Sequence, residues 1–119
     1  MSTQGLIGFY IETRNYGATA ALWQSLGFEA GFETDHGSGQ WRHRSGGPYV
    51  FIAERADPDH ELETHPILGV HDAETFQPDR DLIYARTFEP QHWGVTEAII
   101  VDPDGRWLSL QAPSPPRSA

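Results

Sequence analysis

Residues His92–Leu110, HWGVTEAIIVDPDGRWLSL, carry the clearest secondary-structure signal in the chain. Thr96–Val101 is a short apolar run rich in β-branched residues, which is typical of a strand. Asp102–Gly105 has proline at its second position and glycine at its fourth, the pattern of a tight turn. Arg106–Gln111 follows as a closing strand, so this stretch predicts a β-hairpin near the end of the fold.

Upstream of this hairpin the sequence predicts further short strands and one clear helix. Asn15 is a good N-cap, Ala18, Ala21, Leu22, Ser25 and Leu26 fall at helical spacing, and Gly27 is a suitable stop. These features predict a helix over 15–26 that buries the face carrying those residues. The other expected strands are Leu6–Thr13, Phe28–Thr34, Gln40–Arg44, Tyr49–Glu54, His65–His71 and Leu82–Phe88.

The two halves of the chain repeat one plan of a strand, a helical element and three strands. Asn15 ends the first strand and Asp72 ends the fifth, so counting back seven residues aligns Gly8 with His65. Residues 72–81 occupy the place of a second helix, and Pro78 limits any helix there to about two turns.

The expected organisation is a single domain over residues 1–112, with modules at about 6–55 and 64–112 and a disordered tail at 113–119. The acidic segment 56–64 has no clear period. It is more typical of a solvated linker than of a cation site.

Composition and charge exclude several classes of function. The chain has 119 residues and no cysteine, so disulfides, thiolate metal sites and thiol nucleophiles are absent. Its 17 acidic and 8 basic residues give a net charge of −9, which disfavours nucleic acid and anionic membranes as partners. No apolar run is long enough for a membrane span, and no secretory signal is visible. These features predict a cytoplasmic protein.

Two motifs resemble those of the glyoxalase/bleomycin-resistance (vicinal oxygen chelate) superfamily. LWQSLGFE at 22–29 resembles the family's FY-x-x-LGF stretch, and HWGVTEAIIVDPDGRWLSL resembles its ending W-G…DPDGN-x-x-E-L. The resemblance covers roughly residues 6–112. DPDG alone is a common turn, whereas its combination with an early LGF is much more specific. The resemblance implies an α+β fold of paired βαβββ modules whose mixed sheet forms a cup, here with a truncated second helix.

The resemblance also implies homodimers, often with exchanged elements, and in the family's enzymes a divalent metal held by the first and last strands of a module. The matching positions here are Gly8, Phe51, His65 and Ser109. One imidazole and one hydroxyl are too few, because a catalytic metal needs about three good protein ligands. Nearby Glu12, Glu54 and Glu97 are offset from the matching positions. We therefore expect no metal, no cofactor and no catalytic residues.

The family's ligand positions mark which side of each strand faces the cup, because side chains alternate along a strand. The residues of opposite parity, expected in the helix-side core, are Phe9, Ile11, Val50, Ile52, Leu68, Val70, Ala98, Ile100, Leu108 and Leu110. The cup side is mainly aromatic, which is the composition of a small-molecule site. The ligand-binding residues predicted from this parity are Tyr10, Tyr49, Phe51, His65, Glu97, Trp107 and Ser109. The resemblance adds Phe32 and Trp41, which lie on strands that form the groove wall in the bleomycin-resistance branch, and Trp93 is added from the loop expected beside the cup mouth.

Each of these residues also has a structural interpretation. Any single aromatic residue on a strand often packs only against its neighbours, and His65 is equally compatible with packing and with hydrogen bonding to a ligand. The remaining histidines, His60 among them, are more typical of surface or turn positions. Ser25 and Ser109 have no recognisable nucleophile context, which leaves hydrolase chemistry without support.

The predicted function is sequestration. A non-catalytic homodimer binds a toxic aromatic or glycopeptide-like antibiotic, or an aromatic metabolite, in a groove between protomers and lowers its free concentration. The alternatives are a metal-dependent lyase, isomerase, transferase or dioxygenase with unexpected ligands, and an accessory protein that responds to a drug or metabolite.

Overall fold

The computed structural model describes residues 3–114, which form two compact units. The first unit comprises residues 7–65, and the second comprises residues 3–6 and 66–114. Within the described residues there are eight strands and one helix. That helix is too short to cross a lipid bilayer.

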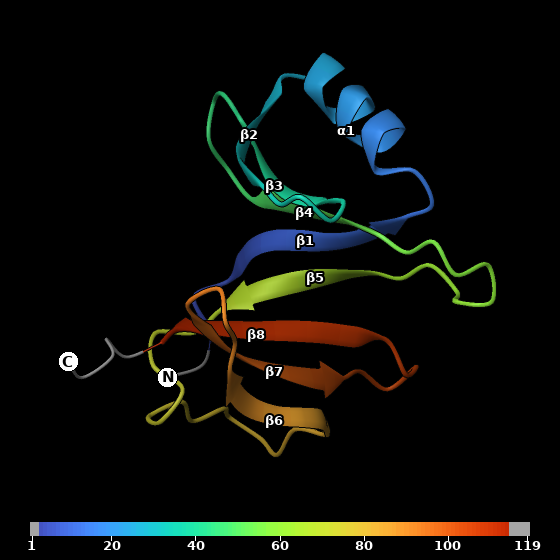
Figure 1. The fold of residues 1–119 in the computed structure, drawn as a ribbon. Helices are drawn as coiled ribbons and strands as arrows, with labels where there is room; N and C mark the ends of the chain where they lie inside the picture. The colour runs from blue at the N-terminus through green and yellow to red at the C-terminus, as the bar shows by residue number, and fades with distance from the viewer. Residues whose placement is uncertain (1–2, 115–119) are drawn as a thin grey trace. The chain divides into compact units, whose positions relative to one another are not determined.

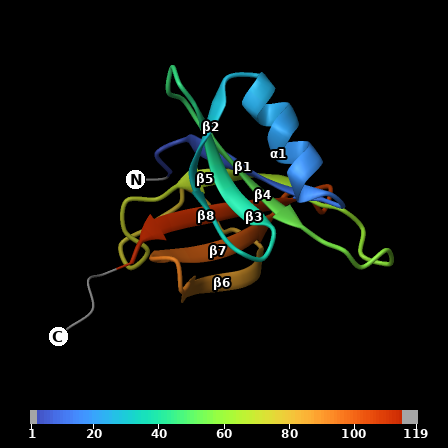
Figure 2. The same cartoon turned by 45° about the horizontal axis from the view of Figure 1, so that its top comes forward.

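The first unit has the expected order of strand, helix and three strands. Its elements are β1 (Leu6–Thr13), α1 (Tyr16–Ser25), β2 (Phe28–Glu33), β3 (Ser38–His43) and β4 (Tyr49–Glu54). The strands lie in the order β2-β3-β4-β1, with β4 parallel to β1 and β3 antiparallel to both of its neighbours. Helix α1 lies on one side of these strands, which leaves their other face without a helix (Figures 1 and 2).

Helix α1 begins and ends where the sequence predicts. The Asn15 side chain accepts a 3.0 Å hydrogen bond from the Ala18 amide, and Gly27 follows the helix with a φ of 97°. The face predicted to be buried is wrong, however. Leu22 and Leu26 are 57% and 56% exposed, whereas Ala20 is buried. The larger ring of Trp23 decides the face, because it packs edge-on against Phe28 with centroids 5.0 Å apart.

Strand pairing in the first unit confirms the predicted alternation on β1 and β4. Ile11 pairs with Ile52, and both contribute to the core under α1. Tyr10 pairs with Phe51, so these two side chains lie on the opposite face of the sheet. The first core comprises Ala20, Trp41, Val50 and Ile52, with Ile11, Tyr16, Trp23 and Phe28 packed against it.

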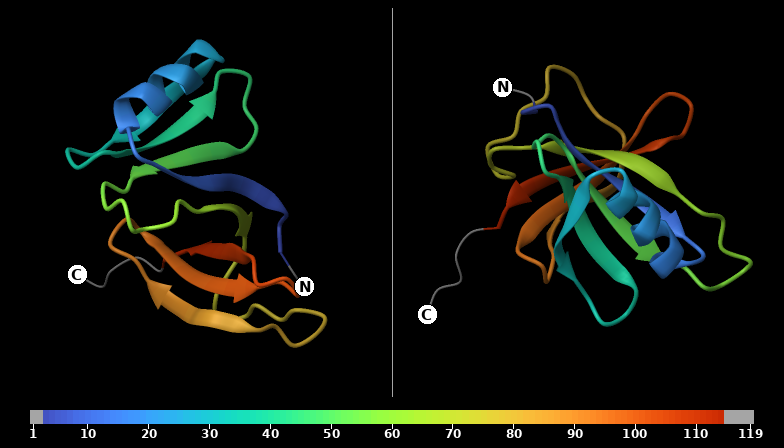
Figure 3. Two further views of the ribbon diagram at one scale, coloured as in Figure 1. Left: turned by 90° about the vertical axis from the view of Figure 1, so that its right-hand side faces the viewer. Right: turned by 90° about the horizontal axis from the view of Figure 1, so that it is seen from above.

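The second unit contains β5 (Thr64–Gly69), β6 (Tyr84–Pro90), β7 (Val95–Val101) and β8 (Trp107–Pro113). The first two residues of β5 group with the first unit. The strands lie in the order β5-β8-β7-β6, with β5 parallel to β8 and the other pairs antiparallel (Figure 3). The predicted turn is present, because the Gly105 amide donates a 3.0 Å hydrogen bond to the Asp102 carbonyl.

The place of a second helix is taken by residues 71–83, which form turns and contain no helical residue. Asp72 starts this segment by accepting a 3.0 Å hydrogen bond from the Glu74 amide. Ala73, Phe76 and Leu82 from the segment pack on the second core, so apolar side chains cover the sheet without a helix. The buried members of that core are Val70, Ala98, Leu110 and Ala112.

The strand pairing is equivalent at the aligned positions of the two halves. Aligning Gly8 with His65 places Tyr10 opposite Ile67 in the alignment. In the structure, Tyr10 pairs with Phe51 on β4, and Ile67 pairs with Ser109 on β8. Ser109 is therefore the counterpart of Phe51.

Strand β8 continues to Pro113, one residue beyond the predicted end of the domain, and residues 115–119 of the predicted tail lie outside the described residues.

Candidate functional site

Four ring side chains gather on the helix-free face of the first unit, and we call them the aromatic face: Tyr10, Phe32, Phe51 and His65. The rings of Tyr10 and Phe51 are stacked with centroids 6.2 Å apart, and Phe32 lies 6.2 Å from Phe51. His65 is tilted against Tyr10 at 5.0 Å. The structure therefore brings together four of the ten predicted ligand-binding residues.

Strand pairing explains why these rings meet. Phe51 pairs with Tyr10 on one side and with Gln40 on the other, and Gln40 in turn pairs with Phe32. Phe32 is 45% exposed, and Tyr10 and Phe51 are partly buried. The face thus combines apolar rings with accessible area, as a surface for stacking a flat ligand requires.

Tyr49 lies on the predicted strand, but its side chain is packed against neighbouring residues and is not accessible to a ligand. It is 9% exposed, and its ring lies directly against Gly8. The guanidinium of Arg42 lies 5.6 Å from the centroid of the same ring. These contacts give Tyr49 a structural role on this face.

Trp41 is the clear error among the predicted ligand-binding residues. It is 5% exposed and belongs to the core under α1, where its Nε1–H donates a 3.1 Å hydrogen bond to the Tyr16 hydroxyl. The physical reason is register. Trp41 pairs with Val50, a residue on the helix side, and side chains of paired residues point to the same face.

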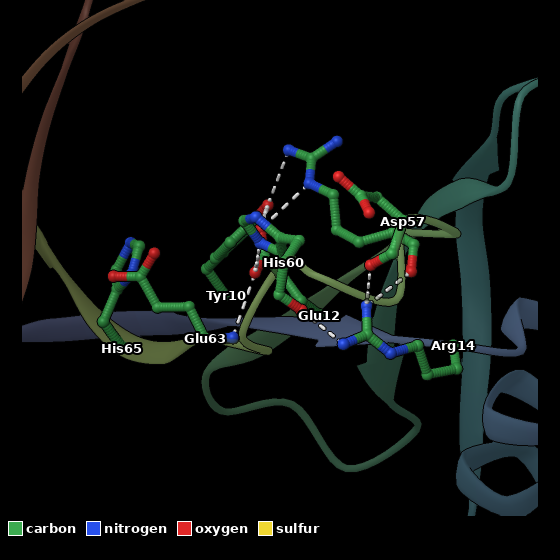
Figure 4. A network of polar contacts seen from close by, with 8 residues as sticks. Tyr10, Glu12, Arg14, Asp57, His60, Glu63 and His65 are labelled. Atoms are coloured by element: carbon green, nitrogen blue, oxygen red, sulfur yellow. Dashed lines mark hydrogen bonds and ion pairs between the residues drawn. The ribbon is translucent and has the colours of Figure 1, made fainter.

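Glu12 lies at the centre of a polar network beside the aromatic face (Figure 4). Its side chain is 4% exposed. Oε2 accepts hydrogen bonds from the Tyr10 hydroxyl at 2.7 Å and from Arg55 Nε at 3.0 Å. Oε1 accepts from His60 Nε2 at 2.7 Å and from the Glu63 amide at 3.0 Å. Four donors therefore compensate for the burial of one carboxylate.

The network fixes the charge state of its members. Burial raises the pKa of Glu12, but the hydrogen bonds from Tyr10, His60, Arg55 and the Glu63 backbone outweigh it and lower that pKa to about 2. Burial, followed by the bond to Glu12, raises the pKa of Tyr10 well above its ordinary value. At neutral pH Glu12 is therefore an anion and Tyr10 a neutral phenol.

Arg14, the residue directly after β1, holds the backbone between β4 and β5. Arg14 Nη1 donates to the carbonyl oxygens of Arg55 at 3.0 Å and Asp57 at 2.8 Å, and Nη2 donates to that of His60 (Figure 4). The acidic side chains Asp57, Asp59 and Glu61 are exposed, as the linker prediction expects. The backbone of the segment is nevertheless fixed by Arg14, and His60, whose side chain is 41% exposed as its predicted surface position expects, also donates to Glu12.

The remaining candidates lie in the second unit. Ser109 is fully buried and donates a 2.6 Å hydrogen bond to Glu97 Oε2, which also accepts from Gln111 Nε2 at 2.7 Å. Trp107 is 37% exposed, with the Arg86 guanidinium 5.8 Å from its ring centroid. Trp93 is 50% exposed in the turn after β6 and makes an edge contact with His92.

The donor set does not assemble a metal site within residues 3–114, where no group of three or more His, Asp or Glu side chains is arranged to hold an ion. His65 is the single strong donor among the four positions that match the family's ligands, and its Nδ1 is engaged with Glu63 at 3.1 Å. Absence of a metal from the purified protein stays a prediction.

Sequence reasoning missed Glu12, Arg55 and His60. A signal for Glu12 was present, because it shares the parity of Tyr10 on β1 and so had to lie on the same face as the rings. A charged residue at such a position requires partners. Arg55 and His60 could not be found in this way, because they come from a segment without periodicity.

Comparisons with known proteins place the fold. No protein-family model and no curated protein sequence matches the chain. A glyoxalase/bleomycin resistance protein/dioxygenase superfamily member from Vibrio splendidus matches with a TM-score of 0.64 and 13% identity, over 88% of this chain and 96% of that one. A 2,2',3-trihydroxybiphenyl 1,2-dioxygenase from Sphingomonas wittichii matches with a TM-score of 0.61 and 13% identity, over 99% of this chain and 43% of that one. At these identities the similarity concerns the fold alone.

Proposed function

We propose that this chain, which shares the fold of the glyoxalase/bleomycin resistance protein/dioxygenase superfamily, binds a planar aromatic small molecule and sequesters it without chemical conversion. The observation that carries the proposal is the aromatic face, where Phe51 lies between Tyr10 and Phe32. A flat ligand stacked on these rings gains buried apolar area and ring–ring contact. The proposed ligand class is an aromatic or glycopeptide-like antibiotic or an aromatic metabolite.

The donor chemistry at the family's metal positions supports binding rather than catalysis. Gly8 has no side chain, and the Tyr49 ring occupies the space beside it. Phe51 offers a ring, and the Ser109 hydroxyl is committed to Glu97. Substrate activation by a metal needs an ion with an open coordination position, and these residues do not supply its ligands.

The Glu12 network supports the same proposal by positioning Tyr10. The Tyr10 hydroxyl donates to Glu12 and accepts from Arg55 Nη2 at 3.1 Å. A ring held at its polar end loses less conformational freedom when a ligand stacks on it, which favours affinity. Trp93, Trp107 and Glu97 stay predicted ligand contacts.

We also propose that the chain acts as a cytoplasmic homodimer whose partner copy completes the groove. A partner would cover the exposed apolar side chains of Leu22 on α1, Leu26 at the C-cap of α1 and Tyr84 on β6. Light scattering at micromolar concentration is expected to give about twice 13.3 kDa. A monomer that binds ligand fully would contradict a shared groove.

Sequestration and catalysis are distinguished by mass balance. Small molecules that remain bound through a native purification are identified by mass spectrometry, and bleomycin and planar aromatic antibiotics are tested by equilibrium dialysis. We expect saturation at one ligand per chain, with all of the compound recovered unchanged. Loss of compound with turnover would favour an enzyme. Failure of every compound to bind, with nothing retained during purification, would overturn the proposal.

A further inference from the structure

We propose that His65 Nε2 is the hydrogen-bond acceptor of the aromatic face and that it selects flat ligands carrying an O–H or N–H donor, such as a phenol or a ring N–H. This inference rests on the proposed function, since it assigns the polar specificity of the same site. It begins from the contact between His65 Nδ1 and Glu63 Oε1, which are 3.1 Å apart.

The contact with Glu63 determines the tautomer of His65. A carboxylate can only accept a hydrogen bond, so Nδ1 must carry the proton that lies between them. A neutral imidazole has one protonated and one unprotonated nitrogen, so Nε2 presents a lone pair. The Glu63 backbone amide is bonded to Glu12 at 3.0 Å, which holds residue 63 in place next to His65.

The other nitrogen of His65 is available to a ligand. Nε2 has no hydrogen-bond partner among residues 3–114, although the His65 side chain is only 9% exposed. Within the same residues, no buried side-chain nitrogen or oxygen lacks a partner. Nε2 is therefore not fully buried, and it keeps some accessible area on a ring that is otherwise covered.

Among the four side chains that define the aromatic face, Nε2 is the polar atom left open to a ligand. Phe32 and Phe51 offer apolar rings. The Tyr10 hydroxyl is already bonded to Glu12 and Arg55, so it does not compete for the same ligand group. A ligand stacked on the rings would bring its edge close to His65 Nε2. An O–H or N–H group on that edge would then donate a hydrogen bond to this nitrogen. An ether or an N-methyl group would leave Nε2 desolvated and unpaired, which is costly.

The test uses two flat probes that differ in one donor, indole and N-methylindole. They are titrated into the whole protein and followed by the resonances of Tyr10 in every variant, and also by those of His65 where this residue is present. Indole is expected to bind about 3- to 10-fold more tightly than N-methylindole, the advantage of one hydrogen bond. The variant His65→Phe keeps a ring and removes the acceptor, so it should bind both probes equally. The matched control is His36→Phe in the exposed turn after β2, which should keep the preference for indole.

An independent readout is the tautomer of His65, measured in long-range proton–nitrogen spectra of the free protein at mildly alkaline pH. A proton on Nδ1 is expected, and Glu63→Ala should shift the population towards a proton on Nε2. A proton on Nε2 in the wild type would overturn the inference whether or not a probe binds. Equal binding of the two probes would overturn it while leaving the proposed function intact. Failure of both probes and of the dialysis compounds, with nothing retained during purification, would overturn the proposed function and this inference with it.

Discussion

The ring of Tyr49 on β4 lies so close to Gly8 on β1 that a Cβ atom at residue 8 would be 2.8 Å from the ring's Cε2 and Cζ atoms. Real Cβ atoms do not approach other atoms this closely, so any other residue at position 8 would displace the ring. Position 8 also matches the first-strand metal ligand of the superfamily's enzymes in the resemblance described above. In this chain the position is therefore used for packing between two strands.

The first prediction tests this packing. Gly8→Ala should lower the free energy of unfolding by about 1–3 kcal/mol, because the added methyl group overpacks against Tyr49. In a Tyr49→Ala background the same substitution should cost much less. The control is Gly31→Ala on β2, whose Cβ would be 3.5 Å from its nearest neighbour and should be tolerated. Urea unfolding measures all four variants, and an equal cost with and without Tyr49 would contradict the packing.

The second prediction concerns metal content. The purified protein should carry no tightly bound divalent metal after mild dialysis, because Gly8, Phe51 and Ser109 offer no strong ligand beside His65. Elemental analysis decides this prediction. About one equivalent of zinc, manganese, nickel or iron per chain would refute it and would favour the alternative of a metal-dependent enzyme.

The third prediction concerns the pH dependence of stability. The pKa of Glu12 is lowered from 4.5 to about 2, so the folded state favours the carboxylate. A lowered pKa contributes stability that is fully present above about pH 4.5 and is lost as the pH falls towards about 2. The shift corresponds to about 3 kcal/mol at neutral pH. Glu12→Gln should remove about 2–3 kcal/mol there, and the difference from wild type should shrink as the pH falls through this window.

The matched control for Glu12 is Glu29→Gln on β2. Glu29 Oε1 forms an ion pair with Arg44 Nε at 3.4 Å, but both side chains are more than two-thirds exposed. Little effect on the free energy of unfolding is therefore expected. Urea unfolding of the three proteins across the acidic range provides the measurement. A constant difference between wild type and Glu12→Gln at every pH would show that packing, rather than charge, accounts for the loss.

The local elements could be predicted from the sequence because each depends on residues adjacent in the chain. Asn15 and Gly27 bound the helix, and Asp102–Gly105 forms the turn through its own backbone. The errors concern relations between elements. The burial of Trp41 depends on its register with Val50, and the buried side of α1 depends on the contact between Trp23 and Phe28. Neither relation is encoded in periodicity.

In the candidate site, too, the local pattern of each strand was predictable, whereas contacts between distant segments were not. Alternation along β1 and β4 correctly predicts that Tyr10 and Phe51 share a face. It cannot predict that Arg55 and His60, from a segment without regular structure, complete the hydrogen bonds of Glu12. Long side chains from irregular segments reach their partners through three-dimensional proximity, which a single sequence does not reveal.

The last prediction separates the aromatic face from the core by comparing Phe32 with Trp41. Trp41→Ala should cost about 3–5 kcal/mol of stability, because it empties a buried site and removes the hydrogen bond to Tyr16. Phe32→Ala should cost less than about 1 kcal/mol, because Phe32 is 45% exposed. For a ligand retained in equilibrium dialysis, Phe32→Ala should weaken binding by about 1–3 kcal/mol, or roughly ten- to a hundred-fold, as expected for an aromatic contact.

Two further measurements make this comparison decisive. Trp41→Phe keeps most of the buried ring and should bind the ligand normally at a temperature where the variant is folded, because residue 41 faces α1. Binding is therefore measured only on variants whose thermal unfolding begins well above the assay temperature. If Trp41→Phe lost binding while Phe32→Ala kept it, the ligand would lie on the helix side of the sheet. The assignment of the aromatic face would then be wrong, because a ligand stacked on Phe51 must be sensitive to the ring beside it and insensitive to a side chain on the opposite surface.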